Sequence, residues 1–192
     1  VLLILALVFA TFPRHLPAAS LIRDADIEHA LGELASPILR AAGLSSSRIG
    51  VYVVNDNNMN AFVLDPTAIY IHSGMILRLT SAAELQSVIA HEAAHFWLGE
   101  TVDYATPDEA WITEGGADYL AMQAAVRADA SYDAKAFMAD ARSDCIAALA
   151  KGSLADARRR NDQRAYYACG ALFAKAVDDA GRPRGKGFAD FV

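Results

Sequence analysis

Near the middle of the chain, two histidines lie four residues apart and an acid directly follows the first of them: His91, Glu92 and His95. On a helix, residues at this spacing share one face, with about 5–6 Å between their Cβ atoms, so both imidazoles can reach one metal ion. Glu92 then lies beside the first ligand, where its carboxylate can activate a water molecule. With five histidines in 192 residues, chance is a poor explanation. The pattern predicts a zinc site with Glu92 as the general base.

A catalytic zinc ion needs a third protein ligand and one open position. Glu114 follows His95 after eighteen intervening residues, early in the next expected helix, and an ordinary solvated acid there would leave the histidine pair unexplained. Asp118 lies one turn further on the same face, where it can accept the outer N–H of a liganding histidine and fix its tautomer. We therefore expect one zinc ion per chain, bound by His91, His95 and Glu114, with Asp118 supporting a ligand.

Two glycines follow the expected third ligand, Gly115 and Gly116. A glycine inside a helix costs about 1 kcal/mol relative to alanine. A close approach between this helix and the helix that carries the histidines would offset that cost, so we expect the two helices to meet here.

The downstream motifs resemble the aminopeptidase N and glycyl aminopeptidase type of gluzincin metallopeptidase. The resemblance rests on His91–Gly99, on Trp111–Leu120 and on the spacing between the second histidine and the glutamate. Tyr167–Gly170 resembles the segment that carries the transition-state-stabilising tyrosine of those enzymes, which implies this role for Tyr167. Without the resemblance, Tyr167 would be interpreted as an aromatic residue of the core.

The upstream half resembles a different branch, the HtpX and CaaX-prenyl-protease family of metallopeptidases. That family also has a glutamate and an aspartate four residues apart, although usually much further from the histidine motif. Both resemblances imply zinc-dependent hydrolysis of a peptide or protein substrate, and together they cover residues 50–175. The upstream resemblance rests on Asn60–Phe62, Ile69–Ile71, Ser73–Ile76 and Glu84–His95.

The resemblance to aminopeptidase N fails at one point that concerns the substrate. In those enzymes a Gly-Ala-Met-Glu-Asn segment supplies the glutamate that anchors the free amine, whereas the comparable Ser73–Leu77 has no acid. This difference favours an endopeptidase. Three alternatives stay open: an aminopeptidase of the same clan, a catalytically inactive zincin that acts as a periplasmic binding or assembly factor, and a metal-free helical interaction domain, which leaves the histidine motif unexplained.

Composition and the chain termini suggest a location. The net charge of −6 argues against a general nucleic-acid-binding surface. Residues 1–10 are uninterruptedly apolar but too short to span a bilayer, which takes about 20 residues. We interpret residues 1–20 as a signal peptide, or else as a truncated membrane anchor through which the chain would associate with a membrane. Either places the domain formed by residues 21–192 outside the cytoplasm, periplasmic or secreted, where Cys145 and Cys169 can form a disulfide.

The sequence periodicity predicts an α+β domain of the zincin type. The expected helix over residues 26–42 contains Pro37, which should kink it or divide it in two. Strands are expected over residues 49–54, 61–64 and 68–72, the last two joined by a turn. In the expected fold, a small sheet has its edge strand, residues 68–72, beside the active-site cleft. A mostly helical C-terminal half follows, with helices expected over residues 81–98, 106–122, 133–150 and 163–180.

Overall fold

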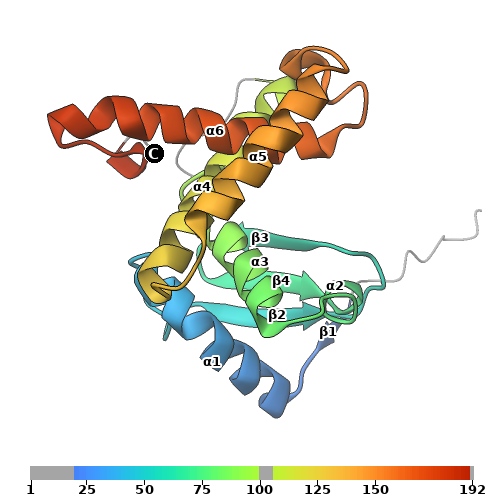
Figure 1. Cartoon of the computed structure of the whole chain (residues 1–192). Helices are drawn as coiled ribbons and strands as arrows, with labels where there is room; N and C mark the ends of the chain where they lie inside the picture. The colour runs from blue at the N-terminus through green and yellow to red at the C-terminus, as the bar shows by residue number, and fades with distance from the viewer. Residues whose placement is uncertain (1–19, 100–105, 191–192) are drawn as a thin grey trace, which may run out of the picture.

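A four-stranded sheet and six α-helices make up the part of the chain that this computed structural model describes, residues 20–99 and 106–190 (Figure 1). The sheet and its covering helices come first in the sequence, and three long helices follow. The described part of the chain therefore contains both helices and strands, whereas the zincin-like fold stays a prediction. The predicted signal peptide or anchor lies outside the described residues, apart from Ser20. None of the described helices has the length and apolarity needed to cross a membrane.

The sheet has the strand order β1-β2-β4-β3. The central strand β4 pairs in parallel with β2 and antiparallel with β3. The prediction that residues 68–72 form the edge is therefore wrong, because β4 lies between β2 and β3, and the edges are β1 and β3. Burial gives the physical reason: four of the five β4 residues are buried, whereas no residue of β3 is. The strands are β1 (Leu21–Ile22), β2 (Gly50–Val54), β3 (Ala61–Asp65) and β4 (Ala68–His72).

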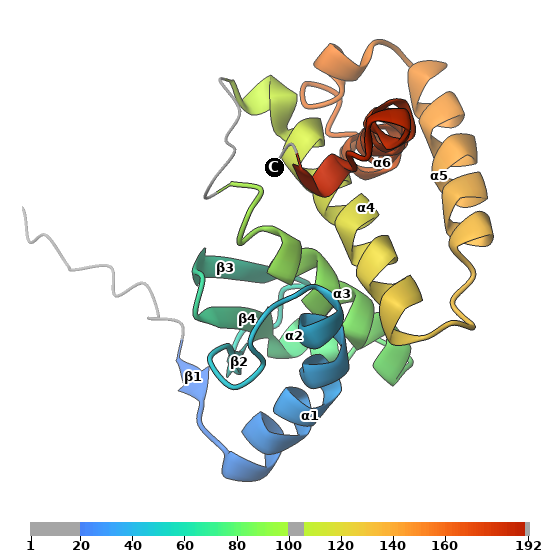
Figure 2. The ribbon, with the colours of Figure 1, turned by 90° about the vertical axis from the view of Figure 1, so that its left-hand side faces the viewer.

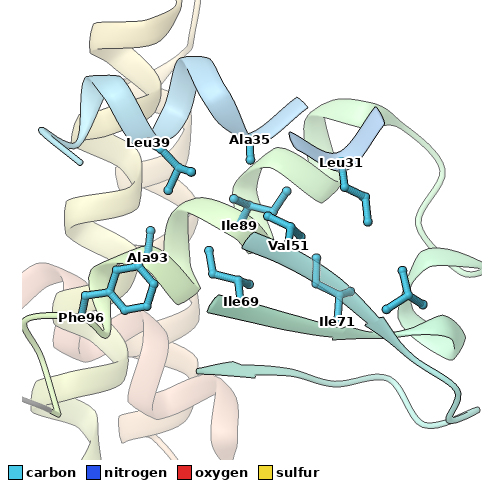
Figure 3. Packing of buried hydrophobic residues seen from close by; sticks show 10 residues of the cluster. Leu31, Ala35, Leu39, Val51, Ile69, Ile71, Ile89, Ala93 and Phe96 are labelled. Atoms are coloured by element: carbon cyan, nitrogen blue, oxygen red, sulfur yellow. The ribbon is translucent and has the colours of Figure 1, made fainter. Parts of the chain in front are cut away.

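Helices α1 (Ala25–Ala41) and α3 (Ala82–Ala94) cover one face of the sheet and close the main core. Figure 3 shows this packing, in which Leu39 of α1 and Ile89 of α3 lie over Ile69 of β4. These three side chains are almost completely removed from solvent, so their burial is the main stabilising contribution in this core. The cluster contains Leu31, Ala35, Leu39, Val51, Val53, Ile69, Ile71, Ile89, Ala93 and Phe96.

Helix α1 continues through Pro37 as a single helix, so of the two predicted outcomes, a kink or a division in two, the division does not occur. Ala35, two residues before the proline, and Ile38, directly after it, are both buried against other elements. Gln86 of α3 donates a hydrogen bond to the Leu34 carbonyl at 3.0 Å. Packing therefore holds the helix together around the position where proline removes a donor, and the Gln86 bond ties this part of α1 to α3.

The start of α3 was predicted correctly and its end was not. Ser81 caps the helix by accepting the Glu84 N–H at 3.2 Å, and Glu84 in turn accepts the Thr80 N–H. The helix ends at Ala94 rather than at residue 98, and His95 lies at its C-terminal cap. Beyond it the chain tightens into turns as far as Gly99, whose φ of 112° suits a residue without a side chain.

The C-terminal half consists of α4 (Ala110–Ala128), α5 (Ala134–Leu149) and α6 (Gln163–Gly181). Helix α4 starts later than predicted, because residues 107–109 form a separate 3₁₀ turn. It also ends later than predicted, at Ala128. The disulfide between Cys145 of α5 and Cys169 of α6 is present, as the sequence predicted. Figure 2 shows α3 between the sheet and these helices, which places the histidine motif at the boundary of the two halves.

Candidate metal centre

Three side chains from two helices converge where α3 ends beside α4. The Nε2 atoms of His91 and His95 lie 3.0 Å apart. Glu114 Oε2 lies 3.3 Å from His91 Nε2 and 3.6 Å from His95 Nε2. Zinc bonds of about 2.0–2.1 Å in a tetrahedral arrangement would separate neighbouring donor atoms by about 3.3 Å. The two nitrogens and one oxygen are therefore spaced for a single zinc ion.

Hydrogen bonds on the outer side of each imidazole orient it toward this point. His91 Nδ1 donates to Asp118 Oδ1 at 2.7 Å, and His95 Nδ1 donates to the Leu98 carbonyl at 3.0 Å. In each ring the Nε2 lone pair is then directed at the metal position. The structure thus brings Asp118 behind a ligand, where the sequence had placed it. The Leu98 carbonyl was missed, because it reaches His95 only through the turn that follows the end of α3.

The carboxylates of the cluster favour a positive charge at the His91 imidazole. Burial would lower the pKa of His91, but Asp118 and Glu114 raise it to about 10. Burial would raise the pKa of Glu114, but the hydrogen bonds to His91 and His95 lower it to about 2. A divalent cation would replace the extra proton of His91, and two neutral imidazoles with one carboxylate form a catalytic zinc set.

Glu92 is buried beside the ligands, with 8% of its surface exposed, and lines the same cleft. Burial raises the pKa of its carboxyl, His91 and His95 oppose this rise, and Glu114 adds to it. A carboxylate with a raised pKa is better able to accept and hold a proton near neutral pH.

Tyr167 of α6 completes the group around the predicted metal position. Its ring centroid lies 5.6 Å from that of His91, and its hydroxyl lies near enough to Glu114 for that carboxylate to affect its pKa. Burial, followed by the charges of Glu114 and Asp118, raises the pKa of this hydroxyl, so the phenol stays a donor. Its neighbour Tyr166 instead packs with Trp111 and Ala148 in a separate cluster.

The crossing of α4 and α6 brings Tyr167 to the cluster. A Cβ atom on Gly115 would lie 2.2 Å from Gly170 Cα, and one on Gly170 would lie 2.0 Å from the Trp111 carbonyl oxygen. The expected contact of Gly115 with the histidine helix is therefore wrong, since its partner is α6. Gly116 does face the turns that follow that helix, where a Cβ atom would lie 2.9 Å from the Leu98 side chain.

The cleft at this centre has a volume of about 720 Å³. Its walls come from α3, α4, α6 and the edge strand β3, with Met59 and Asn60 ahead of the strand. Met75 of the short helix α2 (Ser73–Ile76) also lines it. A cleft of this size beside an open strand edge can hold an extended peptide.

The geometry defines a candidate zinc centre, and comparison with known proteins gives the family. Residues 22–180 match the sequence profile of peptidase family M48. The chain therefore belongs to peptidase family M48, whose metallopeptidases are zinc-dependent. The finer division into an HtpX-like upstream half and an aminopeptidase-like downstream half stays a prediction.

Two curated relatives match shorter stretches. The chain is 31% identical over 74 residues to a candidate beta-barrel assembly-enhancing protease of Vibrio cholerae, which covers 38% of this chain and 15% of that protein. It is 33% identical over 85 residues to the mitochondrial metalloendopeptidase OMA1 of Danio rerio, which covers 42% of this chain and 18% of that protein. The chain thus spans less than a fifth of the length of either relative.

Proposed function

We propose that this protein is a zinc-dependent endopeptidase. The observation that carries the proposal is the convergence of His91, His95 and Glu114 donor atoms at 3.0–3.6 Å in a cleft that also holds Glu92. A bound zinc ion would supply a Lewis acid that polarises the scissile carbonyl and acidifies water.

The side chains around the centre supply the proton transfers and a hydrogen bond. Glu92 takes a proton from the attacking water and delivers it to the leaving amine, a role to which its raised pKa is suited. The Tyr167 hydroxyl donates a hydrogen bond to the substrate's former carbonyl oxygen, on which negative charge develops. Asp118 holds the His91 ring in place throughout.

Edge strand β3 offers the substrate a backbone partner. The His72 N–H donates to the Asn60 carbonyl at 2.9 Å, which makes Ala61 and Ile71 a non-hydrogen-bonded pair of the antiparallel ladder. The N–H and C=O of Ala61 therefore point away from β4. An extended peptide can add to this edge by main-chain hydrogen bonds, without contributing a chain terminus.

The acids of the cleft favour an endopeptidase over an aminopeptidase. Among its described lining residues, the carboxylates are Glu92, Glu114 and Asp118, and each has a role at the centre. Among these described residues, no further carboxylate is left to anchor the free amine of an aminopeptidase substrate. An inactive zincin that serves as a binding factor is the second candidate, but the proposed ligands and general base are all present.

We also propose that the domain acts outside the cytoplasm. The disulfide between Cys145 and Cys169 supports this location, because such bonds persist in oxidising compartments. The apolar residues 1–10 support it as well.

Metal analysis and paired substrates test the proposal. Purified protein should contain about one zinc per chain, lose hydrolysis on chelation and regain it with added zinc. An N-acetylated peptide should be cleaved about as fast as its free-amine twin. Cleavage of the free-amine peptide alone would establish an aminopeptidase, and zinc binding without cleavage of any peptide or denatured protein would favour the binding factor.

A further inference from the structure

A second concave surface uses another face of α4 and shares no lining residue with the catalytic cleft. It is a groove of about 970 Å³ between α4, α5 and α6. The chain turns back after α6, and residues 185–190 form the far wall. In Figure 1 the C-terminal end of α6 extends past α4 and α5, with this turn beneath it.

The rim of the groove is cationic, although the whole chain has a net charge of −6. Each of the two acids that line it accepts a hydrogen bond from a backbone N–H of the far wall. Asp178 accepts the Phe188 N–H at 2.8 Å, and Asp190 accepts the Gly187 N–H at 2.6 Å. The cations that line it are Arg127, Lys135, Lys175, Arg182 and Lys186.

Three of these cations have no ionic partner among the described residues, and one of the three, Arg127, donates hydrogen bonds to Gln123 and the Ala41 carbonyl instead. Lys175 pairs with Asp179 and Arg182 with Asp178. Lys135 and Lys186 form no salt bridge within the two described ranges of the chain. Lys135 also lies in the first turn of α5, where the helix dipole disfavours a positive charge. Fold stability does not account for its position, so its charge is available to a ligand.

The floor of the groove is apolar and its far wall is fixed. Met122, Met138 and Val126 line the floor, and Val126 is 41% exposed. In the wall, Phe188 is only 5% exposed and packs edge-on against Tyr119, with ring centroids 6.0 Å apart. A concavity that exists before binding avoids the cost of ordering it.

We propose that this groove binds an acidic peptide segment that also carries apolar side chains. Carboxylates would pair with the lysines of the rim, while apolar side chains would cover the methionines and Val126 on the floor. Anionic lipid headgroups offer similar charge, but a bilayer presents a broad surface, and here the apolar contacts lie at the bottom of a groove. The proposal requires no catalysis and is independent of the proposed function.

Fluorescence anisotropy with designed peptides tests the groove. The probe is a fluorescein-labelled peptide of alternating glutamate and leucine, and its length after each titration is checked by mass spectrometry. We expect saturable binding that weakens as salt is raised. A glutamine–leucine peptide and a glutamate–serine peptide should each bind at least about tenfold more weakly, because each lacks one of the two contacts.

Matched variants locate the site. Lys135→Glu and Lys186→Glu should each weaken binding by about tenfold, whereas Arg48→Glu makes the same charge change at an exposed position outside the groove and should leave it unchanged. Val126→Ser should weaken binding of the glutamate–leucine peptide but leave binding of the glutamate–serine peptide unchanged. Equal losses in Arg48→Glu, or no binding up to about 1 mM peptide, would overturn the proposal. So would binding to phosphatidylglycerol vesicles that depends on Lys135 while the peptide fails to bind.

Discussion

The Asp118 carboxylate lies 2.7 Å from His91 Nδ1, on the side of the imidazole away from the predicted metal position. It connects the two helices that carry the predicted ligands, since His91 belongs to α3 and Asp118 to α4. One hydrogen bond thus sets both the tautomer of a ligand and the relation of the helices that carry the centre.

Asp118→Asn should weaken zinc affinity about 10–100-fold, because an amide holds the imidazole less firmly and makes it less basic. Competition with a chromophoric chelator measures this affinity. Asp140→Asn is the control, since Asp140 is an exposed acid of a neighbouring cavity. Equal zinc affinity in the Asp118 variant and the parent would contradict the assignment.

Glu92→Gln should keep its zinc and lose most peptide hydrolysis, because the amide cannot accept a proton at neutral pH. Zinc content and turnover are measured on the same preparation. Parental turnover in this variant would show that another group is the general base.

Tyr167→Phe should lower kcat about 10²–10³-fold with little change in KM, since the ring stays and only the donor is lost. Tyr166→Phe is the control on the same helix. The Tyr166 hydroxyl is buried without a hydrogen-bond partner among the described residues, so its removal should leave activity intact and should not lower Tm. The reverse result would move the role to Tyr166.

Gly170→Ala should lower activity by separating α6 from α4, because the new Cβ atom would lie 2.0 Å from the Trp111 carbonyl oxygen. If the loss arises through Tyr167, adding Gly170→Ala to Tyr167→Phe should cost little further activity. Gly32→Ala, which has open space around its Cβ position in α1, is the control and should be harmless or stabilising. Equal losses in both backgrounds would assign Gly170 to general packing.

Asp178 should make the fold sensitive to acid. Burial would raise the pKa of its carboxyl, but the Phe188 N–H, Arg182 and Tyr119 lower it below the ordinary value. A depressed folded pKa gives stability that is complete above the unfolded value of about 3.9 and is lost as pH falls through the folded value. Asp178→Asn should therefore lower the free energy of unfolding by about 1–3 kcal/mol at pH 7 and flatten its decline in acid.

Urea titrations at several pH values measure this effect. Asp179→Asn is the control, because its partly exposed carboxylate pairs only with surface cations and should contribute less than about 1 kcal/mol. A larger change for Asp179 than for Asp178 would contradict the assignment.

Spacing along one helix was the most predictive feature of the sequence. The interval between His91 and His95 implies a shared face whatever the surroundings, and the interval from Glu114 to Asp118 does the same on α4. The disulfide followed from cysteine number and the expected compartment. Each of these inferences uses local geometry or composition, which the rest of the fold does not alter.

Features that depend on tertiary packing could not be predicted in the same way. The apolar run of β4 fits an edge or a central strand, and only pairing with both β2 and β3 makes it central. Gly115 indicates a close contact but not its partner, which is Gly170. The Leu98 carbonyl depends on α3 ending at Ala94, where the turns after His95 replace the expected last helical turn.

The irregular pairing between Val63 and Asp65 interrupts edge strand β3 near its end. A regular, open strand edge invites another copy of the chain to extend the sheet, and Leu64, 69% exposed, would strengthen such self-association. The interruption limits the regular edge to Ala61–Val63, long enough for a few substrate residues and too short to template a growing sheet. The same irregularity therefore limits edge-to-edge association between copies of the chain while leaving a short open edge beside the cleft.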